Sequence, residues 1–287
     1  MKKRMGKKLG AASVSIGVNV VLLISKFIAA LITGSIGLYA ESAHSLFDVL
    51  ASVLAYLGIK KAEEPEDSNH HFGHEKFENL SSLIQALLII GTACVVIFEA
   101  YGRFSAPGKV ESSEIGIALM VISIPVIFLT SKYLGKIAKS EGSSALEADS
   151  AHFTTDVISS VSVLVGLVLV KFGFQIGDPL AAFVVGFIML FISAQLLVRS
   201  FFVFLDFSPD EEIMGRIRRI MESEKRITRF HKLRARIAGS RVLVDVHIHV
   251  PHDMSIEKAH IISHELESRI IREVKEVKEV SIHIEPD

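Results

Sequence analysis

Six apolar stretches, each close to the length that a helix needs to cross a lipid bilayer, dominate the first part of this 287-residue chain. A helix needs about 20 predominantly apolar residues to cross the hydrocarbon core, and backbone polar groups in lipid must be satisfied within the spanning segment. The pattern therefore predicts an α-helical membrane protein with six transmembrane helices and excludes a single soluble enzyme domain. The predicted spans cover 11–33, 38–59, 80–101, 115–134, 151–172 and 180–205, with breaks at 34–37, 60–78, 105–114, 135–144 and 173–179.

Charged residues are divided unevenly along the chain. Of the first 208 residues 33 are charged, against 30 of the 79 residues over 209–287. The composition predicts a membrane domain over 1–208 and a separate, charged domain over 209–287. The formal net charge of −1 gives no basic field that would attract nucleic acid, so no nucleic-acid partner is expected. The single cysteine, Cys94, permits no intrachain disulfide.

Lysine and arginine are concentrated on one side of the predicted spans. Cytoplasmic segments of membrane proteins carry an excess of these two residues. The excess lies before the first span and in the second and fourth connecting segments: Lys2, Lys3, Arg4, Lys7, Lys8, Lys60, Lys61, Lys76, Lys132, Lys136 and Lys139. The distribution predicts that both termini, and with them the charged domain, lie in the cytoplasm.

Two of the predicted spans contain the same polar pattern, His-x-x-x-Asp. The pairs are His44 with Asp48 and His152 with Asp156, and a spacing of four places each pair on one helix face. Ionisable groups at membrane depth are costly and usually functional. Two such helices side by side offer two imidazole nitrogens and two carboxylate oxygens, a ligand set that suits a tetrahedral divalent cation, above all zinc.

Four other polar residues in the spans are less informative. Glu41 and Asp149 each stand three residues before a histidine of the pattern, and we expect them near helix ends as water-facing or gating charges rather than as direct ligands. Asn19 is expected to form a hydrogen bond to a neighbouring helix. Lys26 is expected to extend toward the membrane interface.

The chain resembles the cation diffusion facilitator family in its spans, its two polar pairs, its second loop and its compact tail. The loop carries Asn-His-His-Phe-Gly-His-Glu-Lys over 69–76. The resemblance implies a homodimer in the cell (inner) membrane that exports a divalent metal cation in exchange for protons by alternating access. The set of two histidines and two aspartates resembles the zinc-selective type, with Cd²⁺, Co²⁺, Fe²⁺ or Mn²⁺ as further possible substrates.

The second loop and the ends of two spans carry further residues that the resemblance singles out. Asp67, His70 and His74 are implied as ligands of one zinc ion, and His71 is spare. The alternative is a solvated polar loop without a metal. The resemblance also implies a charge pair between Lys76 and Asp206, which would join the third and sixth spans as a structural interlock.

The tail is predicted to be an α+β domain like that of the metallochaperones. Its elements are a helix over 209–223, strands over 228–237 and 241–250, a helix over 255–272 and a strand over 279–285, in the order αββαβ. Apolar and polar residues alternate over 242–250, so the charged and histidine positions of that strand share one face.

Seven of the 12 histidines fall in this tail. The resemblance implies a regulatory dinuclear zinc site made by His231, His247, His260, His283 and Glu285. The other three histidines have no counterpart in the family pattern, and we expect them to be surface residues: His249, His252 and His264.

The function expected from these features is efflux of a divalent metal cation, most simply Zn²⁺, coupled to proton uptake. A membrane-anchored zinc sensor without transport is the alternative, because it would also need a histidine-rich tail. An intramembrane metalloenzyme is not expected, since four protein ligands leave no open position for an activated water.

Overall fold

The computed structural model describes residues 2–33, 36–105, 114–172 and 176–287. The chain divides into two compact units, Met1–Phe201 and Phe202–Asp287. Three of the expected breaks between spans fall partly outside the described residues. The parts outside are 34–35 of the break at 34–37, 106–113 of that at 105–114, and 173–175 of that at 173–179.

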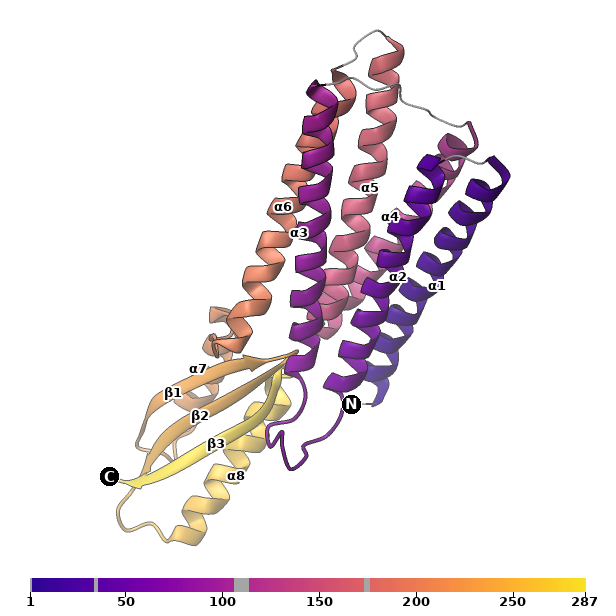
Figure 1. Ribbon diagram of the computed structural model, residues 1–287. Helices are drawn as coiled ribbons and strands as arrows, with labels where there is room; N and C mark the ends of the chain where they lie inside the picture. The colour runs from indigo at the N-terminus through magenta and orange to yellow at the C-terminus, as the bar shows by residue number, and fades with distance from the viewer. Residues whose placement is uncertain (1, 34–35, 106–113, 173–175) are drawn as a thin grey trace. The chain divides into compact units, whose positions relative to one another are not determined.

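The first unit is a bundle of long helices that run alternately up and down (Figure 1). Four of the described helices are long and apolar enough to cross a bilayer, over Gly6–Ile32, Lys76–Gly102, Ile117–Glu141 and Pro179–Phe204. The prediction of a helical membrane domain is confirmed, and the count of six spans stays a prediction. The helices are α1 (Lys2–Thr33), α2 (Ile36–Ala62), α3 (Lys76–Ser105), α4 (Glu114–Glu141), α5 (Ser144–Lys171) and α6 (Gly177–Phe204).

Large apolar side chains on the outside of the bundle agree with a lipid environment. Ile32, Phe98, Ile122 and Phe187 are all exposed, although each belongs to a long regular helix. A soluble protein would bury such residues, because exposed apolar surface of this extent is unfavourable in water.

The helices approach one another closely because small residues line their contacts. At the end of the bundle where α1 and α5 begin and α2 ends, which we call the N-proximal end, alanines and larger apolar side chains form one buried cluster. Small residues let helix backbones pack tightly in a membrane. A side chain on Gly58 would lie 2.4 Å from the Cβ atom of Ser81, so α2 and α3 need glycine at their contact.

A buried ion pair joins α1 to α3 at the N-proximal end. Lys8 Nζ lies 3.0 Å from Glu78 Oε2, and the two side chains are 4% and 2% exposed. The hydroxyl of Ser143, just before α5, donates to the other carboxylate oxygen of Glu78. The contact therefore links three segments of the bundle where water is largely excluded.

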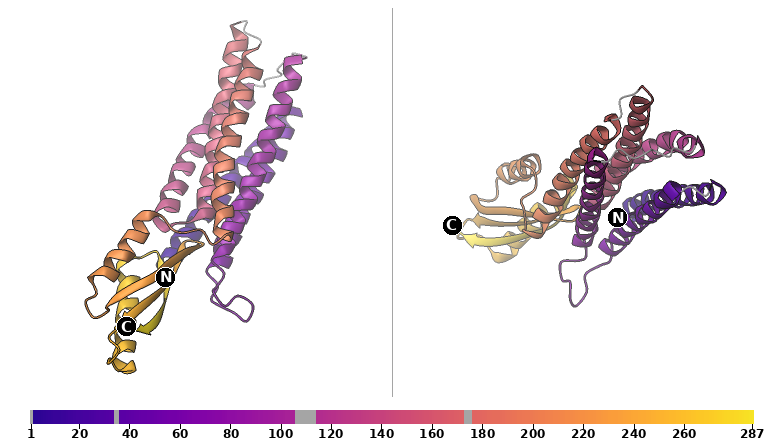
Figure 2. Two further views of the ribbon diagram at one scale, coloured as in Figure 1. Left: turned by 90° about the vertical axis from the view of Figure 1, so that its left-hand side faces the viewer. Right: turned by 45° about the horizontal axis from the view of Figure 1, so that its top comes forward.

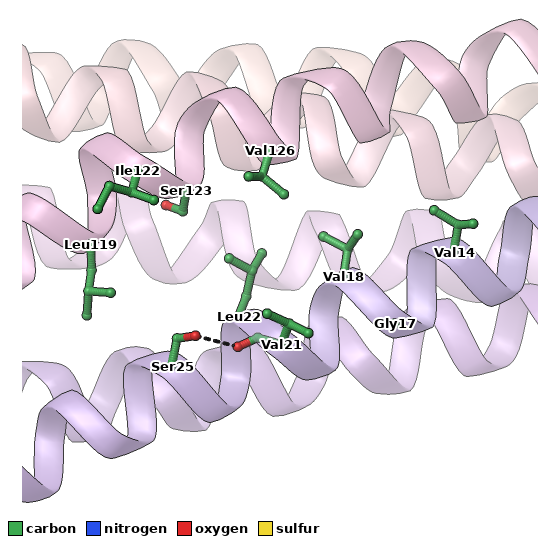
Figure 3. A pocket seen from close by; sticks show the side chains of 10 residues that line it. All are labelled: Val14, Gly17, Val18, Val21, Leu22, Ser25, Leu119, Ile122, Ser123 and Val126. Atoms are coloured by element: carbon green, nitrogen blue, oxygen red, sulfur yellow. Dashed lines mark hydrogen bonds between the residues drawn. The ribbon is translucent and has the colours of Figure 1, made fainter.

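A shallow apolar groove of about 490 Å³ lies between α1 and α4 (Figure 3). No ionisable side chain is among the residues that line it, so the groove offers no ligand for a metal ion. The lining residues are Val14, Gly17, Val18, Val21, Leu22, Ser25, Leu119, Ile122, Ser123 and Val126.

The second unit has the predicted αββαβ order (Figures 1 and 2). Its sheet has the order β1-β2-β3, with β1 antiparallel and β3 parallel to β2. Apolar residues of both helices and of the strands form one buried cluster, so the helices cover one face of the sheet and leave the other polar. The elements are α7 (Glu211–Ser223), β1 (Arg229–Ala238), β2 (Arg241–Val250), α8 (Ile256–Glu273) and β3 (Val277–Pro286).

A β-bulge in β1 decides which face His231 occupies. Leu233 and Ala235 pack against the apolar cluster, and strict alternation would place His231 with them. The pairing between β1 and β2 shifts between His231 and Arg234, and Lys232 has a φ of 49°. A bulge inserts one extra residue and re-aims the neighbouring side chain. The bulge thus brings His231 opposite His247, on the polar face.

Candidate metal sites

Helices α2 and α5 bring the two His-x-x-x-Asp pairs together inside the bundle. His152 Nε2 lies 3.1 Å from Asp48 Oδ1, and His44 Nε2 lies 3.7 Å from the same oxygen. His152 Nε2 is also 3.9 Å from Asp156 Oδ2. His44, Asp48 and Asp156 each offer one ligand atom, and these three atoms lie within 4.8 Å of one another. We call His44, Asp48, His152 and Asp156 the tetrad.

The tetrad is largely removed from the outside of the bundle. Asp48 and His152 are 7% and 8% exposed, Asp156 is half-buried and His44 is the most open of the four. Two nitrogens and two oxygens are the kind and number of donors that a closed four-coordinate site uses, and His152 approaches the group of three through Asp48. Isolated charges would be unfavourable there, and mutual pairing or a bound cation relieves that cost.

Neighbouring polar groups hold the tetrad helices in register. The Asn19 amide donates to the backbone carbonyl of Asp48, 3.2 Å away, and to the hydroxyl of Ser52, 2.8 Å away. The expected hydrogen bond from Asn19 to another helix is therefore present. Lys26 donates to Ser45 on α2, 3.0 Å away, and so also contacts a neighbouring helix. Groups around a metal site orient its ligands in this way.

Asp149 does not face water, and that expectation is wrong. The residue is 0% exposed and lies in the second turn of α5, inside the bundle. Its Oδ1 accepts a hydrogen bond from Ser52, 3.1 Å away. The sequence places Asp149 near a helix end, but the side chain points into the bundle, where Ser52 of α2 bonds to it.

The loop between α2 and α3 gathers the three predicted ligands. Asp67 Oδ1 lies 3.1 Å from His70 Nδ1, and Asp67 Oδ2 lies 3.3 Å from His74 Nε2. His74 is 2% exposed and its Nδ1 is 3.0 Å from the carbonyl of Pro65, which fixes the ring. The spare His71 is exposed and does not belong to this group of three.

Backbone hydrogen bonds prepare Asp67 for a cation. The N–H groups of Asn69 and His70 donate to its Oδ1 at 2.8 and 2.7 Å. These bonds hold the pKa of Asp67 at about 2, so the carboxylate stays ionised near neutral pH. An ionised carboxylate beside two imidazoles is a suitable partial ligand set for a divalent metal.

The polar face of the tail sheet holds two clusters that share Glu285. In one cluster, His247 Nδ1 lies 2.7 Å and His283 Nε2 lies 3.7 Å from Glu285 Oε1. In the other, His249 Nε2 lies 3.2 Å and His231 Nε2 lies 3.9 Å from Glu285 Oε2. Each cluster has ligand atoms within 4.8 Å of one another. A carboxylate shared in this way can bridge two metal ions.

Both pKa shifts in this region favour the forms that bind a metal. The hydrogen bond from His247 holds the pKa of Glu285 below its ordinary value. Partial desolvation lowers the pKa of His231; the charge of Glu285 opposes this shift, and the imidazoles of His249 and His247 add to it. A carboxylate and a neutral imidazole are the metal-binding forms of these side chains.

One expectation for the tail histidines is wrong, and another stays a prediction. His249 is not a surface residue, because it is 6% exposed and its Nε2 lies 3.2 Å from His231 Nδ1. His260 lies on α8, exposed beside His264, and belongs to neither described cluster. The His-x-His pattern in β2 places both side chains on one face, and the parallel register, which the sequence does not display, sets His249 beside Glu285. His252 and His264 are exposed, as predicted.

The predicted pair between Lys76 and Asp206 stays a prediction, because the two residues belong to different units. Within its own unit, Asp206 accepts a hydrogen bond from Arg236, with 3.0 Å between the guanidinium nitrogen and the carboxylate oxygen.

Comparison with known proteins identifies the class of protein to which a chain with these sites belongs. The family model described as the cation efflux transmembrane domain matches residues 12–205, and the model of the cation efflux protein cytoplasmic domain matches 209–287. The chain belongs to the cation efflux family, that is, the cation diffusion facilitators. It is a membrane transporter for divalent metal efflux rather than an enzyme.

Two similar proteins cover almost the whole chain, and a similar solved structure covers a smaller part of it. The cation-efflux pump FieF of Shewanella oneidensis is 32% identical over 96% of this chain and 93% of its own length. The manganese efflux system protein MneP of Bacillus subtilis is 29% identical over 96% of this chain and 95% of its own. The metal-bound C-terminal domain of the CzcD transporter from Thermotoga maritima is 23% identical over 26% of this chain and 87% of its own, with a TM-score of 0.26.

Proposed function

We propose that this protein exports Zn²⁺ from the cytoplasm in exchange for protons, by alternating access in a homodimer. The convergence of the tetrad between α2 and α5 is the observation that carries the proposal. A site of this kind, at membrane depth, serves a cation that passes through rather than one that stays. The match to the transmembrane cation efflux model supports transport over a sensor that only binds metal.

The donor set supports zinc over harder cations. Two imidazoles and two carboxylates suit a borderline ion with tetrahedral preference, whereas manganese and magnesium favour sites made of oxygen ligands. MneP is named for manganese efflux, so the family also includes proteins named for another metal. In this chain the two histidines of the tetrad are therefore the proposed basis of zinc selectivity, with Cd²⁺, Co²⁺ and Fe²⁺ as weaker substrates.

Exchange for protons follows from the chemistry of the ligands. Metal binding requires neutral imidazole and ionised carboxylate, so protons and metal compete for the same atoms. Imidazole titrates near neutral pH, within the range that a membrane pH difference spans. A proton that enters from outside can displace the metal there and leave on the cytoplasmic side.

The loop and tail clusters are proposed as cytoplasmic metal sites. Asp67, His70 and His74 form a loop site with two exposed ligands and one buried ligand, which suits metal capture at the membrane surface. The two clusters around Glu285 are suited to regulation, in which bound zinc draws two tails together and favours transport. His260 would join them only if a second copy of the chain supplied it, and the tail's match to a family model of the cytoplasmic domain supports that arrangement.

We also propose that the protein lies in the inner membrane with both termini in the cytoplasm. The distribution of lysine and arginine supports this orientation of the termini.

Proteoliposomes that contain the purified protein test the function directly. We expect an outward-directed zinc flux that a pH step accelerates, together with proton movement in the opposite direction. Manganese should be transported at least about tenfold less efficiently, because the imidazole ligands suit it poorly. Zinc flux that ignores a pH step would contradict proton exchange, and equal manganese flux would contradict the proposed selectivity.

Replacing His249 should remove one tail site. His249→Ala takes one of three ligands from the cluster with His231 and Glu285, so its zinc affinity should fall at least about tenfold, since losing even an outer hydrogen-bond partner costs that much. Metal analysis of the full-length protein after dialysis against dilute zinc should show one zinc ion fewer per chain. His252→Ala, which changes an exposed histidine nearby, is the matched control. Unchanged zinc content in His249→Ala would exclude the second cluster.

A further inference from the structure

Asp149 is a buried acid that the tetrad does not use. Its side chain is completely shielded, and its Oδ2 has no hydrogen-bond partner in the described structure. It precedes His152 by three residues, so it lies about one helical turn from the tetrad toward the N-proximal end. That end is the one that the lysine distribution assigns to the cytoplasm.

A chain of polar groups connects Asp149 to the tetrad. Ser52 donates to Asp149 Oδ1 at 3.1 Å, and the Ser52 hydroxyl is 2.7 Å from that of Ser15 on α1. Asn19 donates both to Ser52 and to the backbone carbonyl of Asp48. Three helices therefore meet at Asp149 through neutral groups, and the tetrad's backbone is part of the same network.

Among the described residues, no lysine or arginine forms a hydrogen bond or an ion pair with Asp149. Helices α1 and α2 present the neutral side chains of Ser15, Asn19 and Ser52 to this network. Among the described titratable groups, His152 on the same helix is the one that acts on Asp149 electrostatically. An ionised carboxylate with one free oxygen is strongly disfavoured in such surroundings. A proton on Oδ2 removes the charge and changes none of the hydrogen bonds to Oδ1.

From this geometry we propose that Asp149 is a proton-carrying residue of the transport cycle, which holds a proton while its side chain is shielded, as it is here, and releases it to the cytoplasm when the N-proximal end opens. An O–H bond forms at Oδ2 when the proton arrives and breaks when water accepts it, and no electrons are transferred. The proposal rests on the proposed zinc/proton exchange. It adds one carboxylate, outside the metal ligands, to the groups that determine how many protons move per metal ion.

The test measures how steep a zinc gradient a fixed pH difference can sustain. Proteoliposomes are held at zero membrane potential with potassium and valinomycin, and the zinc ratio is read when net flux stops. If one coupled proton is lost, the sustained ratio falls about tenfold for each unit of pH difference, because one proton contributes one factor of ten per unit. We expect this fall in Asp149→Asn, which keeps the shape of the side chain but cannot release a proton.

The matched control is Glu147→Gln, two residues away on α5. Glu147 is a carboxylate at the side of the bundle that pairs with Arg199, and it should keep the wild-type ratio. If wild-type protein sustains no zinc gradient from a pH difference, the proposed exchange fails. If wild type does and Asp149→Asn equals it, the exchange stands and the role of Asp149 is overturned.

If Asp149→Asn transports no zinc, infrared spectroscopy can still measure whether Asp149 carries a proton. A protonated carboxyl group shows a C=O stretching band that shifts in D₂O, and this band is read without turnover. Wild type and Glu147→Gln should both show the band of a shielded, protonated carboxyl at neutral pH, and Asp149→Asn should lack it. The same band in all three proteins would overturn the proposal.

Discussion

Alanine in place of His152 is expected to reduce zinc transport at least about 100-fold, because it removes a ligand outright and even outer partners of metal ligands are worth 10–100-fold. His152 is the buried imidazole of the tetrad, and its Nε2 lies 3.1 Å from Asp48 and 3.9 Å from Asp156. Its loss leaves at most three ligands and a cavity between α2 and α5. Zinc flux into proteoliposomes measures the effect.

A comparison with an exposed histidine of the second unit tests whether the loss of zinc flux comes from the tetrad. His264→Ala removes an exposed imidazole from α8 and should leave the flux within about twofold of wild type, as surface substitutions usually have small effects. Size-exclusion chromatography of both variants verifies that folding and oligomeric state are preserved. Substantial zinc flux in well-folded His152→Ala protein would remove the tetrad from the transport mechanism.

Glutamine in place of Glu78 is expected to destabilise the membrane domain by about 3–5 kcal/mol, the usual cost of breaking a buried ion pair from one side. Lys8 would keep its charge in a setting where the Lys8 side chain is only 4% exposed. For a domain of this size the midpoint of thermal unfolding should fall by roughly 6–20 °C. Circular dichroism of the detergent-solubilised protein during heating measures this midpoint.

The double variant Lys8→Met/Glu78→Leu separates charge from packing. Removing both charges avoids breaking the pair from one side, so most of the lost stability should return. Lys7→Met breaks the neighbouring pair with Glu141, in which the lysine is 54% exposed, and should cost less than about 1 kcal/mol. A Glu78→Gln protein as stable as Lys7→Met would show that the buried pair does not hold α1 to α3.

Local patterns in the sequence account for most of the fold. The length of the apolar stretches predicts the long helices, and the alternation of apolar and polar residues over 242–250 predicts β2 with its buried apolar face. The tetrad could also be predicted, because a spacing of four residues fixes His and Asp on one face of a helix and two such helices form a four-ligand set. These features depend on neighbours within a few residues, which a sequence displays directly.

The parts that could not be predicted depend on contacts between distant segments. Asp149 is buried inside the bundle, and Ser52, which donates a hydrogen bond to it, lies 97 positions away in the chain. The Lys8–Glu78 pair joins residues 70 positions apart, with no periodic signal between them. His249 was assigned to the surface because the family pattern has no ligand there, although its face was correctly predicted. His231 reaches the same face only because of a bulge that alternation does not show.

Anomalous diffraction from zinc-soaked crystals of the full-length protein is the most direct test of the tetrad. We expect a zinc peak between α2 and α5, about 2.0–2.2 Å from one atom of each tetrad side chain. Peaks at the tail clusters in the same map would show that zinc has entered the crystal. Zinc density at the tail but none within coordinating distance of His44, Asp48, His152 and Asp156 would contradict the account.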